Sequence, residues 1–177
     1  MRVFLAIDVP KELNVELKKL QNEIKPLGRF SFVHHFHLTL AFLGEKNNNE
    51  IKEIIEAIDQ FVISKRNAFE RMILRTTELD MFNNRVVFLG LENNGEFIKR
   101  VNELRNSLPY FYDNKPLHPH ITLARVKEFY YENEKIKNAL KKINENLEGF
   151  EFKINLKLYQ SILKKPHPEY KLIKQFL

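Results

Sequence analysis

The feature that most constrains this chain is a four-residue pattern that occurs twice, as HLTL at residues 37–40 and as HITL at residues 120–123. Successive side chains of a β-strand point to opposite faces, so the His and Thr of each copy share one face and the apolar residues share the other. The chain contains only six His and four Thr, so composition alone does not explain two copies. We therefore predict two strands whose polar faces together form one site.

The two copies belong to a longer repeat. Both His residues and both Thr residues of the pattern are separated by 83 positions, and the apolar runs VFLAIDV (3–9) and VVFLGLE (86–92) also start 83 positions apart. In each half the order is apolar strand, helix, His/Thr strand, helix, strand. A period this long excludes a solenoid. We predict an internal duplication with units of about 1–83 and 84–177.

The spacing of apolar residues predicts the other elements. The sequence FERMILRTTELDMF (69–82) predicts a long bent strand or a strand pair that ends at the turn residues Asn83 and Asn84. FSFV (30–33) is expected to lead directly into the first His/Thr strand. Apolar residues three or four positions apart predict four amphipathic helices, with buried faces within residues 13–24, 51–62, 97–108 and 136–147.

These elements predict an α+β fold of a single domain, residues 1–177, because a chain of this length is the usual size of one domain. The duplication predicts two lobes related by a pseudo-two-fold axis. Antiparallel sheets would line a central cleft, with the helices packed outside. The axis would bring the two His/Thr strands face to face.

Charge and composition limit the class of partner. The chain has 29 Lys and Arg against 23 Asp and Glu, and this net charge of +6 favours an acidic partner such as nucleic acid. Lys spread over solvated helix faces explains the charge equally well. No apolar run reaches the roughly 18 residues that cross a bilayer, no signal-peptide cleavage pattern is present, and there is no Cys. We expect a cytoplasmic protein with no membrane partner.

Two His and two Thr in one site suit transfer at a phosphorus centre without a metal. The ordinary His pKa of about 6.5 leaves both protonation states accessible near neutral pH, so one imidazole can take a proton from water while the other gives one to the leaving oxygen. Each Thr hydroxyl can donate a hydrogen bond to a phosphoryl oxygen. A strained cyclic phosphodiester, whose leaving oxygen stays tethered, suits a site with so few groups.

Two other interpretations remain open at this point. His35 and His118 also recur at the interval of 83, so four imidazoles, with those of His37 and His120, could hold a zinc ion. Against this, neither motif contains an acidic ligand, and His118 precedes Pro119, which favours extended or turn geometry before the strand. A non-enzymatic RNA-binding module would explain the charge and the aromatic residues, but not the paired His and Thr.

Arg125 closes the second pattern as HITLAR. Its guanidinium could contact a phosphate, yet on a flat strand Arg125 lies on the face opposite His120 and reaches the cleft only if the strand twists or bulges. The alternative is a surface Arg. Five aromatic residues could stack on a base. They are Phe82, Tyr110, Tyr112, Tyr130 and Tyr131.

Taken together, these motifs resemble a known family. VFLAIDVP, HLTLAFLGE, VVFLGL, HPHITLAR and the closing LYQSIL and YKLIKQF are similar to the two-histidine phosphoesterases, specifically the RNA 2′,3′-cyclic phosphodiesterases once called 2′-5′ RNA ligases. The resemblance covers nearly the whole chain. The lead-in FVHHFHLT is more His-rich than in the family, which leaves His34 and His35 as bystanders or extra substrate contacts.

The resemblance implies a bilobal α+β fold with a basic cleft, no cofactor or metal, and hydrolysis of a terminal 2′,3′-cyclic phosphate on RNA to a 2′-phosphomonoester. It implies that His37 donates a proton to the leaving 3′ oxygen, that His120 is the base that activates water, and that Thr39 and Thr122 hold the phosphate. Members of the family also join or cleave 2′-5′ linkages in tRNA halves. RNA ends, tRNA fragments among them, are therefore the expected partners, with no obligate protein partner.

Overall fold

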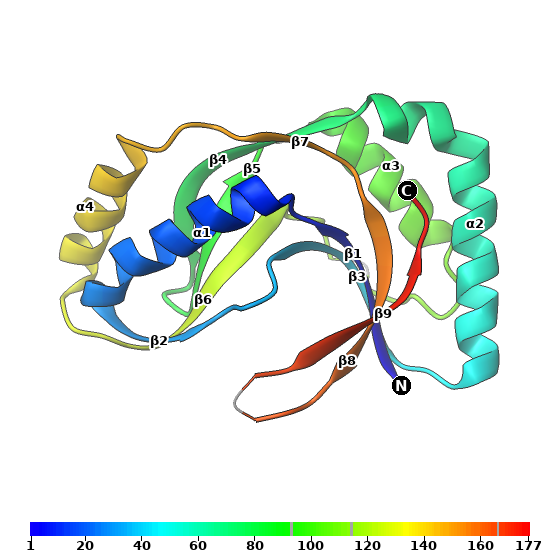
Figure 1. The fold of residues 1–177 in the computed structure, drawn as a ribbon, viewed down its shortest axis with the longest axis horizontal. Helices are drawn as coiled ribbons and strands as arrows, with labels where there is room; N and C mark the ends of the chain where they lie inside the picture. Colours follow the sequence, from blue (N-terminus) through cyan, green and yellow to red (C-terminus); the bar gives the residue numbers. More distant parts are fainter. Residues whose placement is uncertain (93, 114, 166) are drawn as a thin grey trace.

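A computed structural model describes residues 1–92, 94–113, 115–165 and 167–177 (Figure 1). The helices are α1 (Lys11–Ile24), α2 (Asn48–Arg71), α3 (Gly95–Ser107) and α4 (Asn133–Asn144), with a 3-10 helix at Lys25–Leu27. The strands are β1 (Arg2–Asp8), β2 (Gly28–Phe32), β3 (His37–Glu45), β4 (Ile73–Phe82), β5 (Val86–Leu91), β6 (His120–Phe129), β7 (Glu151–Lys153), β8 (Leu156–Ile162) and β9 (Glu169–Gln175). Within these described ranges, no helix is long and apolar enough to cross a membrane.

The strands form one curled antiparallel sheet with the order β7-β4-β5-β6-β3-β1-β8-β9, and β2 pairs with the second half of β6. Reading outwards from the centre, β6, β5 and β4 occupy the same positions as β3, β1 and β8 in the other half of the sheet. This order is the one that the predicted duplication would give. Each half of the sheet also contains strands of both sequence repeats, since β4 pairs with β5 and β8 pairs with β1.

The helices lie in two pairs at opposite ends of the molecule (Figure 1). Helices α1 and α4 accompany the half of the sheet that contains β4, β5 and β6, while α2 and α3 accompany the other half. Each pair combines one helix from each repeat. In α1 the predicted residues Leu13, Leu17, Leu20 and Ile24 are all buried, as their helical spacing requires. The predicted α+β class, with an antiparallel sheet and packed helices, is confirmed.

Helix α2 is longer than predicted. It starts at Asn48, after the N-cap Asn47, which forms a capping box with Glu50, and it ends only at Arg71. The first residues of the strand predicted over 69–82 are therefore helical. The reason is packing: Phe69 continues the buried face of the helix, and no Gly or Pro interrupts the segment.

The predicted link between residues 30–33 and the first His/Thr strand is also wrong. Strand β2 ends at Phe32 and pairs with β6, whereas β3 starts at His37 and pairs mainly with β1. The chain bends at His34 and His35 between the two strands. Strand β3 meets β6 again at Leu38, so the two strands are separated by this bend and not by a change of partner alone.

The pairing of β1 and β5 with the His/Thr strands corrects the repeat interval that the sequence predicts for β1 and β5. Asp8 of β1 pairs with His37, and Gly90 of β5 pairs with His120. Relative to the His/Thr strands, β1 and β5 are thus related by 82 residues and not by 83. The two apolar runs start 83 positions apart in the sequence, but the hydrogen-bonded register decides which side chains are equivalent.

Close packing between β2 and β6 leads to a stability prediction. A Cβ at Gly28 would overlap the backbone oxygen of Glu128, so Gly28→Ala should lower the free energy of unfolding by about 1–3 kcal/mol, the usual cost of overpacking. Gly95→Ala, at the start of α3 with no heavy atom near the new methyl group, is the matched control. Chemical denaturation measures both. Equal free energies of unfolding for the two variants would contradict this packing.

Candidate active site

Both His/Thr strands open into one cleft of about 940 Å³. His37, Thr39, His120 and Thr122 all line this cleft. Its volume lies at the upper end of the range of about 300–1,000 Å³ that is usual for small-molecule and cofactor sites. The structure thus brings together the four side chains that the repeated pattern singled out.

The pairing of β3 with β6 sets the arrangement of these side chains. The two strands meet at Leu38 and Ile121, which pair with each other and are fully buried on the core side. The pairing is antiparallel, so each candidate His lies across from the Thr of the other strand. The four polar side chains therefore form a diagonal arrangement centred on the pseudo-two-fold axis.

The same backbone contact orients both imidazoles. Nδ1 of His37 lies 2.9 Å from the carbonyl oxygen of His35, and Nδ1 of His120 lies 2.6 Å from the carbonyl oxygen of His118. A carbonyl oxygen can only accept, so Nδ1 is the protonated nitrogen in each neutral ring. Nε2 is then the atom of each ring that is left for proton transfer.

Burial lowers the pKa of both imidazoles. The rings of Phe4 and Tyr170 lie with centroids 5.1 and 5.3 Å from that of His37, and the ring of Phe82 lies 5.0 Å from that of His120. Burial lowers the pKa of His37 from 6.5 to about 4 and also lowers the pKa of His120. Both rings are therefore neutral at pH 7 in the free protein. A neutral imidazole can accept a proton, and an anion in the cleft would favour the protonated form.

A β-bulge in β6 brings Arg125 into the cleft. Two consecutive residues of β5 pair with Thr122 and Ala124, which leaves Leu123 as an extra residue. Leu123 and Ala124 are both buried, so the alternation of faces is reset and Arg125 lines the same cleft as His120. The sequence predicted that Arg125 could reach the cleft only if the strand twists or bulges, and the strand does bulge.

The first His/Thr strand has a bulge at the matching position. Ala6 pairs with Thr39 and Leu5 with Ala41, so Leu40 is the extra residue of β3. The side chain beyond this bulge, at the position that corresponds to Arg125, is that of Phe42. Phe42 also lines the cleft and is 63% exposed. One half of the site thus presents a cation where the other half presents an aromatic ring.

Sequence reasoning missed two charged residues beside the site. Asp8, at the end of β1, accepts hydrogen bonds from the side chains of His35, Lys157 and Tyr159. An acidic residue that ends an apolar strand is a signal that could have been followed. Arg105 of α3 lines the cleft and donates from Nε to a carbonyl oxygen of β3 at 2.7 Å. The position of Arg105 on an amphipathic helix gave no sequence signal that it would line the cleft.

The geometry does not support the alternative of a zinc site. Nε2 of His35 lies 3.2 Å from Oδ1 of Asp8, so this nitrogen already has a partner. In the part of the chain that the structure describes, no three His, Asp or Glu side chains are placed to hold a metal ion. The four imidazoles of the two motifs do not converge on one point.

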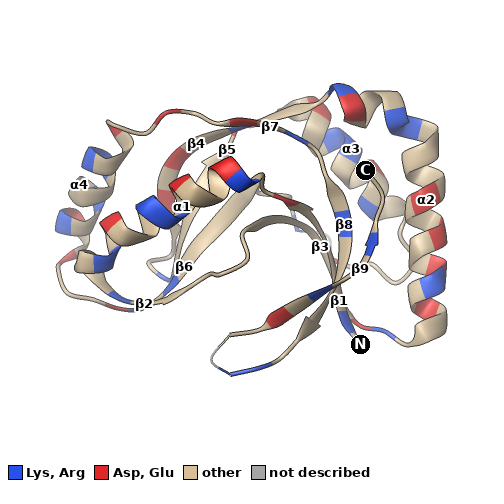
Figure 2. Ribbon diagram, in the orientation of Figure 1, with Lys and Arg blue, Asp and Glu red and all other residues tan. Residues whose placement is uncertain are grey.

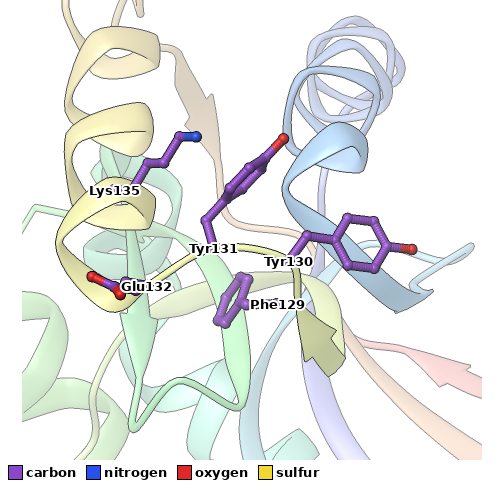
Figure 3. A pocket seen from close by; sticks show the side chains of 5 residues that line it. All are labelled: Phe129, Tyr130, Tyr131, Glu132 and Lys135. Atoms are coloured by element: carbon purple, nitrogen blue, oxygen red, sulfur yellow. The ribbon is translucent and has the colours of Figure 1, made fainter.

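Of the five aromatic residues considered for base stacking, Phe82 lines the cleft among the described residues. Tyr130 and Tyr131 instead line a separate hollow of about 490 Å³ (Figure 3), where Nζ of Lys135 lies 3.8 Å from the Tyr131 ring centroid. The other two tyrosines border neither hollow. No His or Thr of the repeated pattern borders the second hollow, so it is not part of this site.

Charged residues are distributed over the helices, and α1 and α2 carry residues of both signs (Figure 2). This agrees with a solvated surface. The cleft itself has an excess of basic groups among its described lining residues. These basic groups are Arg2, Arg105, Lys115 and Arg125, against the acidic Asp113 and Glu169.

Known proteins match this sequence and fold. The profile of the 2'-5' RNA ligase superfamily matches residues 9–159. An RNA 2′,3′-cyclic phosphodiesterase of Methanocaldococcus jannaschii is 31% identical, and the match covers 99% of this chain and 100% of the relative. One of Thermotoga maritima is 30% identical, with 98% of this chain and 93% of the relative covered.

Solved structures extend the comparison. The crystal structure of TT0787 of Thermus thermophilus is 26% identical, with a TM-score of 0.71 over 99% of this chain and 97% of the other. Apo LigT of Escherichia coli, 24% identical, has the same fold, with a TM-score of 0.70 over 98% and 95% of the two chains. The family profile spans most of the sequence, and relatives match over nearly their full length. The chain belongs to the 2′-5′ RNA ligase superfamily.

Proposed function

We propose that this protein hydrolyses a terminal 2′,3′-cyclic phosphate on RNA to a 2′-phosphomonoester. The observation that carries the proposal is the pair of imidazoles, His37 and His120, which share one cleft and keep Nε2 for proton transfer. The relatives from M. jannaschii and T. maritima are named RNA 2′,3′-cyclic phosphodiesterase, which supports this substrate class. The basic excess in the cleft suits an anionic substrate.

In the proposed reaction, Nε2 of His120 takes a proton from a water molecule while the water oxygen attacks phosphorus. The bond between phosphorus and the 3′ oxygen breaks, and the protonated Nε2 of His37 delivers a proton to that oxygen. The ring opens and the phosphate remains on the 2′ oxygen. His120 ends protonated and His37 neutral, so proton exchange with solvent restores the starting state. The step needs no redox partner and uses only groups of the chain and water.

The other polar side chains of the cleft are proposed to hold the phosphate. The hydroxyls of Thr39 and Thr122 donate hydrogen bonds to the non-bridging oxygens, one from each strand. Arg125 adds a positive charge on the side of His120, where its field also contributes to the lowered pKa of that imidazole. The bound phosphate acts in the opposite direction, because a nearby negative charge favours the protonated form of His.

The same geometry supports a related reaction. If the 5′ hydroxyl of a second RNA end takes the place of water, the step forms a 2′-5′ linkage instead of a free phosphomonoester, and its reversal cleaves that linkage. We propose RNA ends as the partner, tRNA fragments among them, with no obligate protein partner and a cytoplasmic location. The proposed RNA substrate and the absence of Cys support this location.

Replacing either candidate His tests the proposal. His37→Ala and His120→Ala should each lower turnover of a nucleoside 2′,3′-cyclic phosphate by about 10²–10⁴-fold, the range for loss of a general acid or base. Lys18→Ala is the control, since Lys18 is exposed on α1 and does not line the cleft. Its turnover should change by less than about threefold, since surface changes are usually mild.

The product and the turnover of the two His variants decide between an enzyme and a module that only binds RNA. The proposal requires a 2′-monophosphate, identified by chromatography in the presence of a chelator. A 3′-monophosphate would overturn the assignment of the leaving oxygen. If both His variants retain parental turnover, the protein is not this enzyme, and a module that only binds RNA becomes the better account.

The lowered pKa values predict the pH dependence. The base must be neutral and the donor protonated, so the acidic and basic limbs of kcat/KM follow the pKa values of base and donor in the free enzyme. Burial lowers both below 6.5, so the maximum of kcat/KM should lie on the acid side of pH 6.5. The maximum of kcat should lie at higher pH, because bound phosphate raises both pKa values. Steady-state kinetics from about pH 4 to 9 measure both profiles. A kcat/KM maximum above pH 7 would contradict the neutral imidazoles.

Arg125→Gln tests the phosphate contact. Loss of one charged hydrogen-bond donor, at about 1.5–3 kcal/mol, should lower kcat/KM about 10–100-fold. The acidic limb of the pH profile should also move to higher pH, because the charge that lowers the pKa of His120 is removed. Arg29→Gln, which removes an exposed partner of Glu128 outside the cleft, should change neither quantity. Parental kinetics for Arg125→Gln would assign Arg125 to the surface.

A further inference from the structure

We propose that Asp8 is a positioning residue that makes the two halves of the site unequal: it holds His35, and through it His37, and its charge favours a proton on His37 and not on His120. This inference rests on the proposed two-histidine function and deepens it. The repeated sequence treats the two imidazoles alike. Asp8 is where the structure departs from that symmetry.

Asp8 forms a cluster with three other side chains. Its Oδ1 lies 3.2 Å from Nε2 of His35, and its Oδ2 accepts from Nζ of Lys157 at 2.7 Å and from the hydroxyl of Tyr159 at 2.6 Å. The side chains of Asp8 and Lys157 are only 17% and 16% exposed. A carboxylate with three donors in a shielded place holds its partners in one arrangement.

This cluster is joined directly to the candidate proton donor. The ring of His35 donates to Asp8, and the backbone carbonyl of the same His35 accepts from Nδ1 of His37 at 2.9 Å. Asp8 also pairs with His37 across β1 and β3, so the two side chains leave the sheet on the same face. Asp8 can thus act on His37 both through the placement of His35 and through its charge.

Among the residues that the structure describes, the other half of the site has no counterpart to Asp8. The residue that pairs with His120 is Gly90, and the hydroxyl of Thr77 occupies the space that a side chain on Gly90 would need. On this side, the charge of Arg125 and the charge that His118 carries when protonated both disfavour a proton on His120. The charge of Asp8 acts on His37 in the opposite direction, although burial lowers the pKa of His37 by more than Asp8 raises it.

The surrounding groups define what a substitution of Asp8 removes. Burial alone would raise the pKa of Asp8, but hydrogen bonds from His35, Lys157 and Tyr159 outweigh it and hold the pKa well below the ordinary 3.8. Asp8 is therefore ionised at every pH at which the enzyme would work. The charge of Lys157 offsets part of that negative charge.

The groups that face His37 act in both directions. Burial, which includes packing against Phe4 and Tyr170, lowers the pKa of His37, as do the charges that His35 and His120 carry when protonated. Asp8 raises it. Replacing Asp8 by Asn keeps the shape of the side chain and removes the one negative charge that acts on His37 from this cluster.

Asp8→Asn and Lys157→Met test the inference in opposite directions. Asp8→Asn should move the basic limb of the kcat/KM profile to lower pH and leave the acidic limb in place, with kcat/KM at pH 7 about tenfold lower because the protonated donor is scarcer. Lys157→Met should move the same limb to higher pH. Asp59→Asn, which breaks a similar carboxylate–Lys pair with Lys174 outside the cleft, is the matched control and should move neither limb.

Histidine titration by NMR measures the effect of Asp8 on the pKa of His37 without any substrate. The titration of His37 should shift to lower pH in Asp8→Asn and to higher pH in Lys157→Met, while that of His120 stays in place. If the protein lacks phosphodiesterase activity, the proposed function fails but this measurement still tests Asp8. Unmoved titration of His37 in both variants, or movement of the acidic limb instead of the basic one, would overturn the inference. If Asp8→Asn does not fold, the other two variants of the cluster test the inference. Lys157→Met removes a charge, and Tyr159→Phe removes one hydrogen bond and no charge.

Discussion

The pairing of β3 with β6 at Leu38 and Ile121 is the contact on which the candidate site depends. The two strands share only this one pair, and both side chains are fully buried. A slip of one residue in either strand would turn its His and Thr into the core and its apolar residues into the cleft. Burial of these two side chains therefore holds the four polar groups on one face, at the centre of a duplicated sheet.

A second constraint is the pair of bulges that follow the His/Thr pairs. Without Leu40 and Leu123 as extra residues, regular alternation would direct the side chains at Phe42 and Arg125 away from the cleft. Both halves of the sheet contain the bulge, but the side chain that follows the bulge differs between them. The same geometry can thus deliver a ring to one side of a ligand and a charge to the other.

The environment of the imidazoles shows how a symmetric fold supports an asymmetric reaction. Burial lowers the pKa of both His37 and His120, so the free protein has two neutral bases where one acid and one base are required. An entering phosphate can restore one proton, and local charges decide where it resides. The Asp8 cluster on one side and Arg125 on the other are the groups placed to make that choice.

The sequence by itself determined that the chain is duplicated, that it folds as an α+β protein, and which His and Thr share a face. These follow from strand alternation and from spacing, which are local properties of the chain. Only the tertiary structure decided where α2 ends, that Gly90 and not Leu91 is opposite His120, and that Arg125 faces the cleft. Helix ends, strand register and bulges depend on packing against segments far away in the sequence, and so do the charges that make one imidazole differ from the other.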